Sequence, residues 1–502
     1  MASEKTKKTV AAPDGKKEKD NKTSPTTLGI TAKKSEDFSE WYTQAVVKAE
    51  LVDYTLVSGC MVLRPYGYSI WEKIVAAVDS RIKKMGVKNC YFPLFIPESL
   101  LKKEQEHVEG FAPEVAWVTQ AGDTKLDEKL AIRPTSETIM YESFSKWIRS
   151  WRDLPLKLNQ WNNVVRWEFK YPKPFIRTRE FLWQEGHTVH ETKEEAAEQV
   201  MAILKVYTQL VEDYLGIAVI SGRKSEQEKF AGAHYTTTLE ALMPDGKALQ
   251  MGTSHHLGQN FAKPFNISFL GRDGSKQMPW QTSWGVSTRV IGALVMSHGD
   301  DYGLVLPPKI ASIQAIIVPI LFEDTKKQVL LAAEKIVKEL EKEGISAELD
   351  SREIYTAGWK FNEWEMKGVP VRIEIGPRDI EKKQAVLFRR DARTKETVAL
   401  ASIAATVKKK LDEIQESLYK KSKRQLESNI VHVKSISEMA AAVKNRKLAR
   451  GFFCGSAKCE AQVKEKADGA TSRCMTLDNN EKKGKCIVCG EEGITAWFGK
   501  AY

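Results

Sequence analysis

The chain has 502 residues, 42% of them hydrophobic, with 77 Lys and Arg against 66 Asp and Glu and a formal net charge of +11. This length predicts roughly three domains. No apolar run approaches the roughly 18–20 residues needed to cross a bilayer, and no secretory signal pattern opens the chain. We therefore expect a cytoplasmic protein with no membrane association, whose basic surplus favours polyanionic partners.

The first 33 residues form a Lys-rich tail. From Met1 to about Ala32 the sequence consists mainly of Lys, Thr, Glu, Pro and Gly, with scarcely an aliphatic cluster. Such a segment cannot bury enough apolar surface to offset the entropy lost on ordering, so we predict that it is disordered. It either contacts nucleic acid or a partner protein, or acts only as a solubilising tail.

The first predicted helix covers Tyr68–Lys84, where apolar residues recur at helical spacing and Gly86 provides the stop. A predicted strand over Asn89–Phe92 follows and ends at Pro93. A long helix leading into a strand can simply be part of the hydrophobic core. The same shape also occurs at subunit interfaces.

The motif RPTSET precedes a predicted helix over Glu137–Arg149. Thr135 and Ser136 stand where hydroxyl side chains cap a helix N-terminus. A cap accounts for one hydroxyl, but it does not explain why Arg133 and Glu137 flank the same corner.

The stretch Asn159–His187 is predicted to form a hairpin with a long loop. Its strand-like runs are Val164–Phe169 and Phe175–Gln184, separated by prolines that remove backbone donors. Its charged residues include Arg166, Glu168, Arg177, Arg179, Glu180, Glu185 and His187. Buried charges are costly unless they are paired or face a ligand. The hairpin is therefore either part of a ligand site or a salt-bridged sheet surface.

Two later motifs place polar residues among glycines, after a helix that a capping box of Thr192 and Glu195 predicts. LQMGTSHHLG contains Gln250, Thr253, His255 and His256. Paired histidines without a nearby Cys or acidic ligand indicate hydrogen-bonding groups more than a metal site. In QTSWGVSTRVIG, Gly285 permits close backbone approach, and Arg289 can reach a phosphate or stack on a base.

A second domain is predicted after Leu306-Pro-Pro308. Strands at Ile313–Val318 and Val369–Ile375 flank a helix over Asp324–Glu343, which indicates a small α/β domain with a mixed sheet. A predicted loop, Ala357–Trp364, and its surroundings combine aromatic and basic residues, which suits either stacking on unpaired bases or filling a groove between domains. These residues are Trp359, Lys360, Phe361, Trp364, Arg372, Arg378, Arg389 and Arg390.

Five of the seven cysteines lie near the C-terminus, beyond a predicted connecting helix over Val407–Leu426. A C-x4-C pair and a C-x2-C pair supply four thiols at an interval typical of zinc ribbons. The four predicted ligands are Cys454, Cys459, Cys486 and Cys489. With all four positions filled by protein the zinc would be structural, and Cys474 is left over.

Five motifs together, RPTSET, VVRWEF, FIRTREFLWQEGH, QMGTSHHLGQNF and SWGVSTR, resemble those of the prolyl-tRNA synthetases of the eukaryotic and archaeal kind. The resemblance runs from about Asp37 to Tyr502. It implies an α+β fold, with a class II antiparallel-sheet catalytic core, an α/β anticodon-binding domain and a C-terminal α/β zinc-binding domain. The implied ranges are 1–33 for the tail, 34–305, 306–408 and 409–502.

The resemblance implies activation of L-proline with ATP and Mg²⁺ to prolyl-adenylate and pyrophosphate, then transfer to the 3′ end of tRNA(Pro). Catalysis of this kind rests on positioning and electrostatics. The implied catalytic residues are Arg166, Glu168 and Arg289, and Gln250 would hold magnesium with ATP. The implied ATP-binding residues are Arg166, Glu168, Phe175 (as adenine platform), Arg177, Thr178, Gln250, Thr253, Ser287 and Arg289. The implied proline-binding residues are Phe111, Thr135, Glu137, Arg166, Trp183, His187 and His255.

The resemblance also implies a homodimer through the segment before Pro93, and partners for the tail such as a multi-synthetase assembly. Two alternatives remain. A catalytically silent RNA-binding paralogue would not need to keep the implied catalytic set. A threonyl-type enzyme would bind zinc in its catalytic pocket through a cysteine, but no cysteine lies between Cys90 and Cys454.

Overall fold

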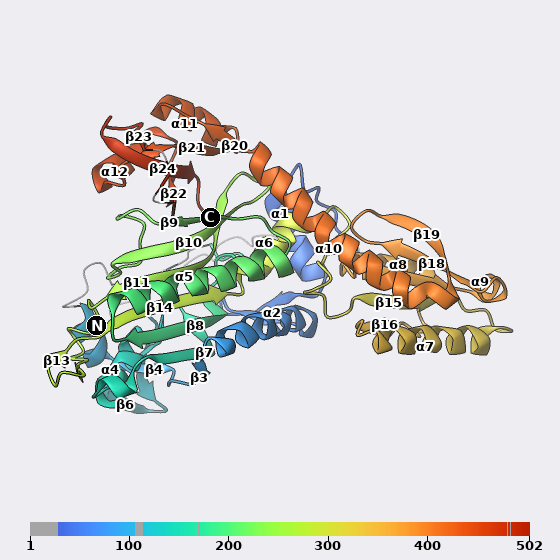
Figure 1. Ribbon diagram of the computed structural model, residues 1–502. Coiled ribbons are helices and arrows are strands. Elements are labelled where there is room, and N and C mark those ends of the chain that lie inside the picture. The colour runs from blue at the N-terminus through green and yellow to red at the C-terminus, as the bar shows by residue number, and fades with distance from the viewer. Residues whose placement is uncertain (1–28, 106–113, 169–170, 479, 482) are drawn as a thin grey trace, which may run out of the picture.

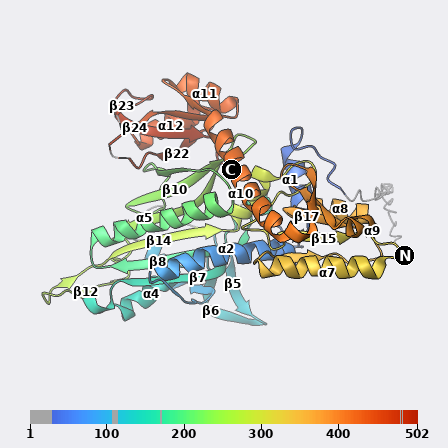
Figure 2. The same cartoon turned by 45° about the vertical axis from the view of Figure 1, so that its right-hand side comes forward.

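The computed structural model describes residues 29–105, 114–168, 171–478, 480–481 and 483–502 (Figure 1). The first domain is built on a long antiparallel sheet, a smaller second domain follows, and a third domain returns to the edge of the first sheet. Helix α10 (Ile403–Ser428) runs from the second domain to the third (Figures 1 and 2). Within these described ranges, no helix is both long enough and apolar enough to span a membrane.

The first domain confirms the predicted antiparallel core. Its strands lie in the order β9-β10-β11-β14-β8-β7-β3, and all neighbours are antiparallel except β3 and β7. The strands are β3 (Lys88–Asn89), β7 (Leu156–Val165), β8 (Glu180–His190), β9 (Ile220–Arg223), β10 (Tyr235–Leu242), β11 (Ala248–Gly258) and β14 (Trp280–Ser287). Smaller strands are β1 (Val52–Tyr54), β2 (Met61–Leu63), β4 (Phe95–Pro97), β5 (Trp117–Ala121), β6 (Thr124–Ile132), β12 (Phe269–Leu270) and β13 (Lys276–Gln277).

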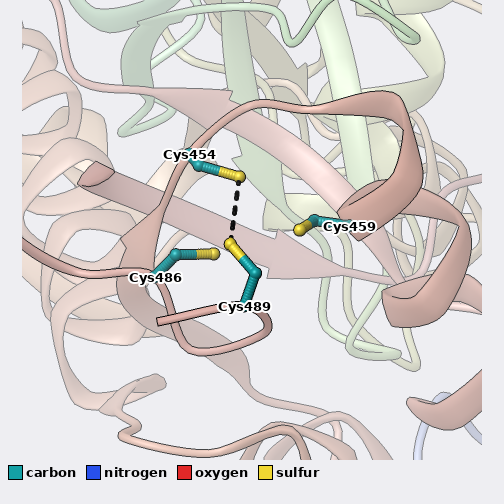
Figure 3. Close-up of side chains that lie close together, drawn as sticks. All are labelled: Cys454, Cys459, Cys486 and Cys489. Carbon is teal, nitrogen blue, oxygen red and sulfur yellow. Dashed lines mark hydrogen bonds between the residues drawn. The ribbon is translucent and has the colours of Figure 1, made fainter. Parts of the chain in front are cut away.

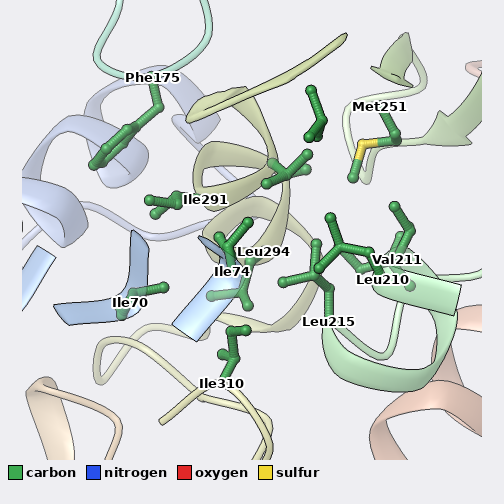
Figure 4. Close-up of a cluster of buried hydrophobic side chains, with 14 of the residues drawn as sticks. Ile70, Ile74, Phe175, Leu210, Val211, Leu215, Met251, Ile291, Leu294 and Ile310 are labelled. Atoms are coloured by element: carbon green, nitrogen blue, oxygen red, sulfur yellow. The ribbon is translucent and has the colours of Figure 1, made fainter. Parts of the chain in front are cut away.

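The helices of this domain are α1 (Phe38–Lys48), α2 (Pro65–Lys84), α3 (Glu98–Gln105), α4 (Glu137–Trp147), α5 (Lys193–Gln209) and α6 (Arg289–His298), with short turns η1 (Trp151–Asp153) and η2 (Leu210–Tyr214). Of these, α1, α2, α5 and α6 share one apolar core with the sheet, part of which is drawn in Figure 4. Helix α5 begins with the predicted capping box, in which the Thr192 hydroxyl accepts a bond from the Glu195 backbone N–H at 3.2 Å. In the core, Ile74 of α2 and Leu294 of α6 lie close together.

The hairpin differs from its prediction in where its strands lie. β7 spans 156–165 and β8 spans 180–190, paired from Leu156 with Val189 to Val165 with Glu180. The predicted first strand therefore starts too late and continues too far. Its first half was missed because Asn159 and Gln160 are polar, yet both are fully buried and hydrogen-bonded to Gln184, Phe92 and Ser136. As a result, Arg166 and Glu168 follow the strand and are not part of it.

Two further expectations need correction. β3 contains only Lys88 and Asn89, shorter than the predicted strand to Phe92. Residues 29–33, placed in the disordered tail, lie against the first domain: the Thr31 backbone N–H donates to the Gln44 side chain at 2.7 Å. The remainder of that tail, residues 1–28, lies outside the described residues.

The second domain has the predicted mixed sheet, in the order β16-β15-β17-β18-β19. Its elements are β15 (Ala315–Pro319), α7 (Lys326–Lys342), β16 (Ala347–Leu349), α8 (Ala357–Met366), β17 (Val371–Ile375), α9 (Pro377–Glu381), β18 (Gln384–Arg389), β19 (Thr394–Ala399) and η3 (Leu400–Ser402).

The predicted aromatic loop of this domain is instead helix α8, capped by Thr356. Several of its basic neighbours are already paired, which corrects their proposed role in base stacking. Arg372 pairs with Glu374 at 2.8 Å, between the rings of Phe361 and Phe388. Arg389 pairs with Asp391, and Arg390 with Asp300. Lys360 is buried and donates to the Asp350 carbonyl.

The third domain adds its strands to the first sheet. They are β20 (Ile430–His432), β21 (Leu448–Phe453), β22 (Thr471–Met475), β23 (Gly484–Lys485) and β24 (Glu492–Gly499), with helices α11 (Ile436–Lys444) and α12 (Ala457–Lys466). β22 meets β9 through Met475 and Arg223, which makes one continuous sheet across the two domains (Figure 1). The third domain is therefore built onto the first.

Candidate active site

A cavity of about 230 Å³ opens on the face of the first sheet between β8, β11 and β14. The strand register explains its lining. His187 is paired with Ser283 and Glu185 with Gly285, while Gly285 is also opposite Thr253 on β11. Because side chains alternate across a strand, residues two apart on each strand point into the same space. A Cβ at Gly285 would lie 3.3 Å from the Trp183 ring, so the glycine keeps this wall close-packed.

One end of the cavity is negatively charged. Glu185 is 2% exposed, and its carboxylate accepts bonds from the Ser136 hydroxyl at 2.5 Å, Gln160 at 2.8 Å, Asn162 at 2.8 Å and His187 at 3.1 Å. Burial opposes ionisation, but these hydrogen bonds outweigh it and lower the pKa of Glu185. Ser136 therefore binds Glu185, and no side-chain cap bond to α4 forms, contrary to the predicted capping role.

His187 and Glu137 complete this end. Burial lowers the pKa of His187, but its bond to Glu185 and the charge of Glu137 outweigh burial and raise it. The Thr135 hydroxyl donates to the Glu137 carboxylate. Two carboxylates, Glu185 and Glu137, therefore act on one histidine, an arrangement that suits a cationic group of a ligand.

His255 stays neutral. Burial, followed by the charge of His187, lowers the pKa of His255 to about 3. Its ring nitrogens contact the hydroxyls of Thr236 at 2.9 Å and Thr253 at 3.0 Å, and the Phe230 ring lies tilted against it with the centroids 4.7 Å apart. At neutral pH, His255 is therefore a hydrogen-bonding group and carries no charge.

The other end of the cavity gathers arginines. Arg166 donates from Nε to the Pro134 carbonyl at 2.9 Å, and its guanidinium lies 5.6 Å from the Phe181 ring and 5.5 Å from the Trp183 ring. Burial, and then the charges of Arg166 and Arg177, lowers the pKa of Arg289 to about 10. Like charges held together in this way are stabilised by a polyanion.

Most predicted site residues meet in this cavity. Those that line it are Thr135, Glu137, Arg166, Trp183, His187, Gln250, Thr253, His255, Ser287 and Arg289. Glu168, Arg177 and Thr178 belong to the connection between β7 and β8 and are not in the lining. Phe111 lies outside the described residues.

Phe175 is misplaced by the prediction. It is 5% exposed, has φ 61°, and packs in the core on the side of Ile291 (Figure 4); it does not line the cavity. Phe181 lines the cavity instead, beside Arg166. Alternation along β8 could have found it, because Phe181, Trp183, Glu185 and His187 are each two residues apart.

Glu185, Glu228 and Lys229 are the other lining residues that the predicted site omits and that carry charge. Three polar atoms of lining residues are also unsatisfied: among the described residues, the indole N–H groups of Trp183 and Trp284 and the Ser283 hydroxyl have no hydrogen-bond partner. Unsatisfied groups of this kind can bond a ligand.

The four predicted metal-binding thiols converge in the third domain (Figure 3). Cys454, Cys459, Cys486 and Cys489 have sulfur atoms all within 4.8 Å of one another, and the Cys454 and Cys489 sulfurs are 3.8 Å apart. A tetrahedral zinc with bonds of about 2.3 Å requires sulfurs about 3.8 Å apart. Cys474 is buried on β22 against Gly222 and is not part of the cluster.

Three family profiles match the chain in series. Residues 117–298 match the tRNA synthetase class II core domain (G, H, P, S and T), residues 314–410 match an anticodon binding domain, and residues 436–502 match the C-terminal domain of prolyl-tRNA synthetase.

Relatives match almost the whole chain. Proline–tRNA ligase of Cenarchaeum symbiosum is 53% identical over 464 residues, which cover 92% of this chain and 97% of the relative. Proline–tRNA ligase 2 of Clostridioides difficile is 51% identical over 461 residues, covering 92% and 95%. The solved prolyl-tRNA synthetase from Cryptosporidium parvum, complexed with halofuginone and AMPPNP, superposes with a TM-score of 0.90 at 45% identity, covering 95% of this chain and 100% of that one.

Proposed function

The chain belongs to the prolyl-tRNA synthetase family, and from this membership we propose that the cavity between β8, β11 and β14 is where its reaction takes place. The chain activates L-proline with ATP to prolyl-adenylate and pyrophosphate, and then transfers proline to the 3′ end of tRNA(Pro). The observation that supports the site best is that a negatively charged end and an arginine cluster share one cavity, and that Arg166 of this cluster is bonded to the Pro134 carbonyl, next to Thr135.

Arg166 and Arg289 are the proposed catalytic residues. Activation brings a carboxylate to the α-phosphate of ATP, so two anions must meet. Arg166 would hold both groups, because its position next to Pro134 and Thr135 puts it beside the amino-acid end. Arg289 would clamp the far end of the triphosphate. Both act by stabilising charge that shifts during the transfer.

Proline would occupy the negatively charged end. Thr135 and Glu137 would bind its secondary ammonium group, and Trp183 and His187 would form walls for its ring. Phe111 is proposed as a further part of that wall. His255 would support the carboxylate side as a neutral hydrogen-bonding group, consistent with a pKa of about 3.

ATP would occupy the arginine end. Phe181 replaces Phe175 as the proposed adenine platform, with the Arg289 guanidinium on the other side of the base. Gln250, Thr253 and Ser287 also line the cavity and are proposed ATP contacts. Arg177 and Thr178 are proposed contacts to the triphosphate; both are outside the lining, but the charge of Arg177 already acts on Arg289.

Magnesium and zinc are proposed as the metals. Glu168 and Gln250 offer the oxygen atoms that Mg²⁺ prefers, and the ion would neutralise phosphate charge. The four-cysteine cluster fits a structural zinc, since all its positions are filled by protein. We expect about one zinc per chain in the wild type and its loss in Cys454→Ser and Cys486→Ser. Metal analysis that finds no zinc in the wild type contradicts the site.

We also propose that the chain is cytoplasmic, that it forms a homodimer through the segment Tyr68–Pro93, and that its tail contacts other proteins. Two large side chains of that segment, Tyr68 and Tyr91, are exposed at 44% and 70%, which supports an interface there. The proposed domain limits are 34–305 for catalysis, 306–408 for anticodon binding and 409–502 for the C-terminal domain.

Proline-dependent exchange of pyrophosphate into ATP tests the site. Arg166→Ala should lower kcat/KM by about a thousandfold, because it removes a contact to the reacting groups. Arg152→Ala, an exposed arginine of the same domain, is the matched control and should keep wild-type exchange. Near-normal exchange in Arg166→Ala would contradict its assignment, and activation of another amino acid in a full panel would contradict the specificity.

A further inference from the structure

Three charged side chains are buried together where the third domain meets the first. Lys224 follows β9, Glu240 lies on β10 and Arg473 comes from β22, and they are 3%, 1% and 5% exposed. The Glu240 carboxylate accepts from Lys224 at 2.7 Å and from the Arg473 Nε and Nη2 at 3.2 and 3.1 Å. Lys224 also donates to the Arg473 carbonyl at 2.9 Å. The third domain therefore supplies one of two cations to a carboxylate of the catalytic sheet.

This cluster reaches the wall of the active-site cavity through a second carboxylate. Glu228 lines the cavity together with Arg289, and its Oε2 lies 3.8 Å from the Arg473 Nη1. Arg473 thus faces two carboxylates at once, one behind the cavity and one in its wall. Glu240 and Arg473 are also among the charges that act on Arg289.

The arrangement leaves Arg289 without a carboxylate partner. Among the described residues, no Asp or Glu lies within 4 Å of the Arg289 guanidinium, although Glu228 shares its cavity. A carboxylate that paired with Arg289 would compete with the triphosphate for it. Holding Glu228 on Arg473 removes that competitor.

We propose that Arg473 of the third domain is a positioning residue for ATP: by holding Glu228 and Glu240, it keeps Arg289 free to bind the triphosphate. Through this side chain, the C-terminal domain then helps to position a residue of the catalytic site. This inference rests on the proposed function, because it assigns the arginine end of the cavity to ATP.

The test is pyrophosphate exchange by the full-length Arg473→Met variant. Its KM for ATP should rise about tenfold, the size expected for coupled charges in contact, while its KM for proline changes less than about twofold. The double variant Arg473→Met/Glu228→Gln should recover most of the ATP affinity, because the freed competitor then carries no charge. A purely structural role for Arg473 would not give this recovery.

Arg450→Met is the matched control. Arg450 also comes from a strand of the third domain and pairs with a carboxylate, Glu481 at 2.7 Å, but within its own domain. It should leave both KM values unchanged. If Arg473→Met does not fold, Arg473→Lys is the alternative variant. It keeps a positive charge but loses the planar guanidinium that binds two carboxylates at once, so it should raise the KM for ATP by a smaller factor.

An unchanged KM for ATP in the folded Arg473 variant, an equal rise for proline and ATP, or no recovery with Glu228→Gln would each overturn the proposal. Failure of the proposed function is a separate result, because it appears as a wild-type chain without proline-dependent exchange.

Discussion

The second and third domains each contact the catalytic domain with a buried arginine, but the two arginines meet different surroundings. Arg390 of the second domain forms a two-pronged pair with Asp300, at 2.6 and 2.7 Å, and the Asp300 side chain keeps 38% of its exposure. Arg473 of the third domain meets Glu240, which is 1% exposed and shared with Lys224. Water can replace a lost partner at the first junction and not at the second.

The two junctions also bear on the same helix. Asp300 follows the C-terminal end of α6, whereas Glu240 and Arg473 act on Arg289, with which α6 begins. The difference in burial therefore predicts a difference in the stability lost when one partner is removed. At the third domain the remaining charges would stay buried and unpaired, whereas at the second domain the remaining arginine could bind water.

Glu240→Gln should have the largest effect. The amide keeps the shape of the side chain but leaves Lys224 and Arg473 buried without a countercharge, which costs about 3–5 kcal/mol of stability. Unfolding of the full chain in denaturant measures this cost, and the third domain should separate first. A loss below about 1 kcal/mol would show that water reaches this junction.

Asp300→Asn should cost less, about 2 kcal/mol, the value of a charge-assisted hydrogen bond. Arg390 keeps its bond to the Glu365 carbonyl at 2.8 Å, and solvent can approach from the side of Asp300. The same unfolding measurement applies. Because the two junctions share no ion-pair partner, the costs of Glu240→Gln and Asp300→Asn should add in the double variant. A strong deviation from additivity would mean that α6 couples the two junctions.

Much of the fold could be predicted where local chemistry and tertiary structure agree. Thr192 and Glu195 form their capping box because both bonds lie within one turn of chain. The strand over 156–163 was missed because Asn159 and Gln160 have the residue types of loops, and their buried side chains are satisfied by partners distant in the chain, such as Phe92 and Gln184.

The site was predicted in its chemistry more than in its geometry. Phe175 and Phe181 are both aromatic residues of one hairpin, and only the strand register shows that Phe181 faces the cavity while Phe175 enters the core. Arg473 lies 233 residues from Glu240 in the chain, so nothing local relates them. Such contacts follow from the packing of domains, which periodicity and motifs do not encode.

The smallest effect at neutral pH is expected for Lys34, at the end of α6 next to Asp300. Its ammonium donates to the carbonyls of Met296 and Gly299 at 2.8 and 2.6 Å, so at neutral pH Lys34→Met should cost about 1 kcal/mol or less, as for a cation at a helix C-terminus. Burial, and then the charge of Lys421, lowers the pKa of Lys34 to about 8.

A lysine whose pKa is lowered in the folded state gives this junction a pH dependence. Between pH 8 and about 10.5, the unfolded chain keeps a proton on Lys34 that the folded chain has released, so the stability contributed by Lys34 increases as pH rises through this window. The difference in unfolding free energy between wild type and Lys34→Met should therefore grow from pH 8 to pH 10. Lys33→Met, which removes a neighbouring lysine that is 56% exposed, is the control and should show no such growth. A constant difference for Lys34→Met would mean that the Lys34 ammonium is solvated at the Asp300 junction as well as it is in water. The two junctions would then differ in solvation by more than their exposed fractions indicate.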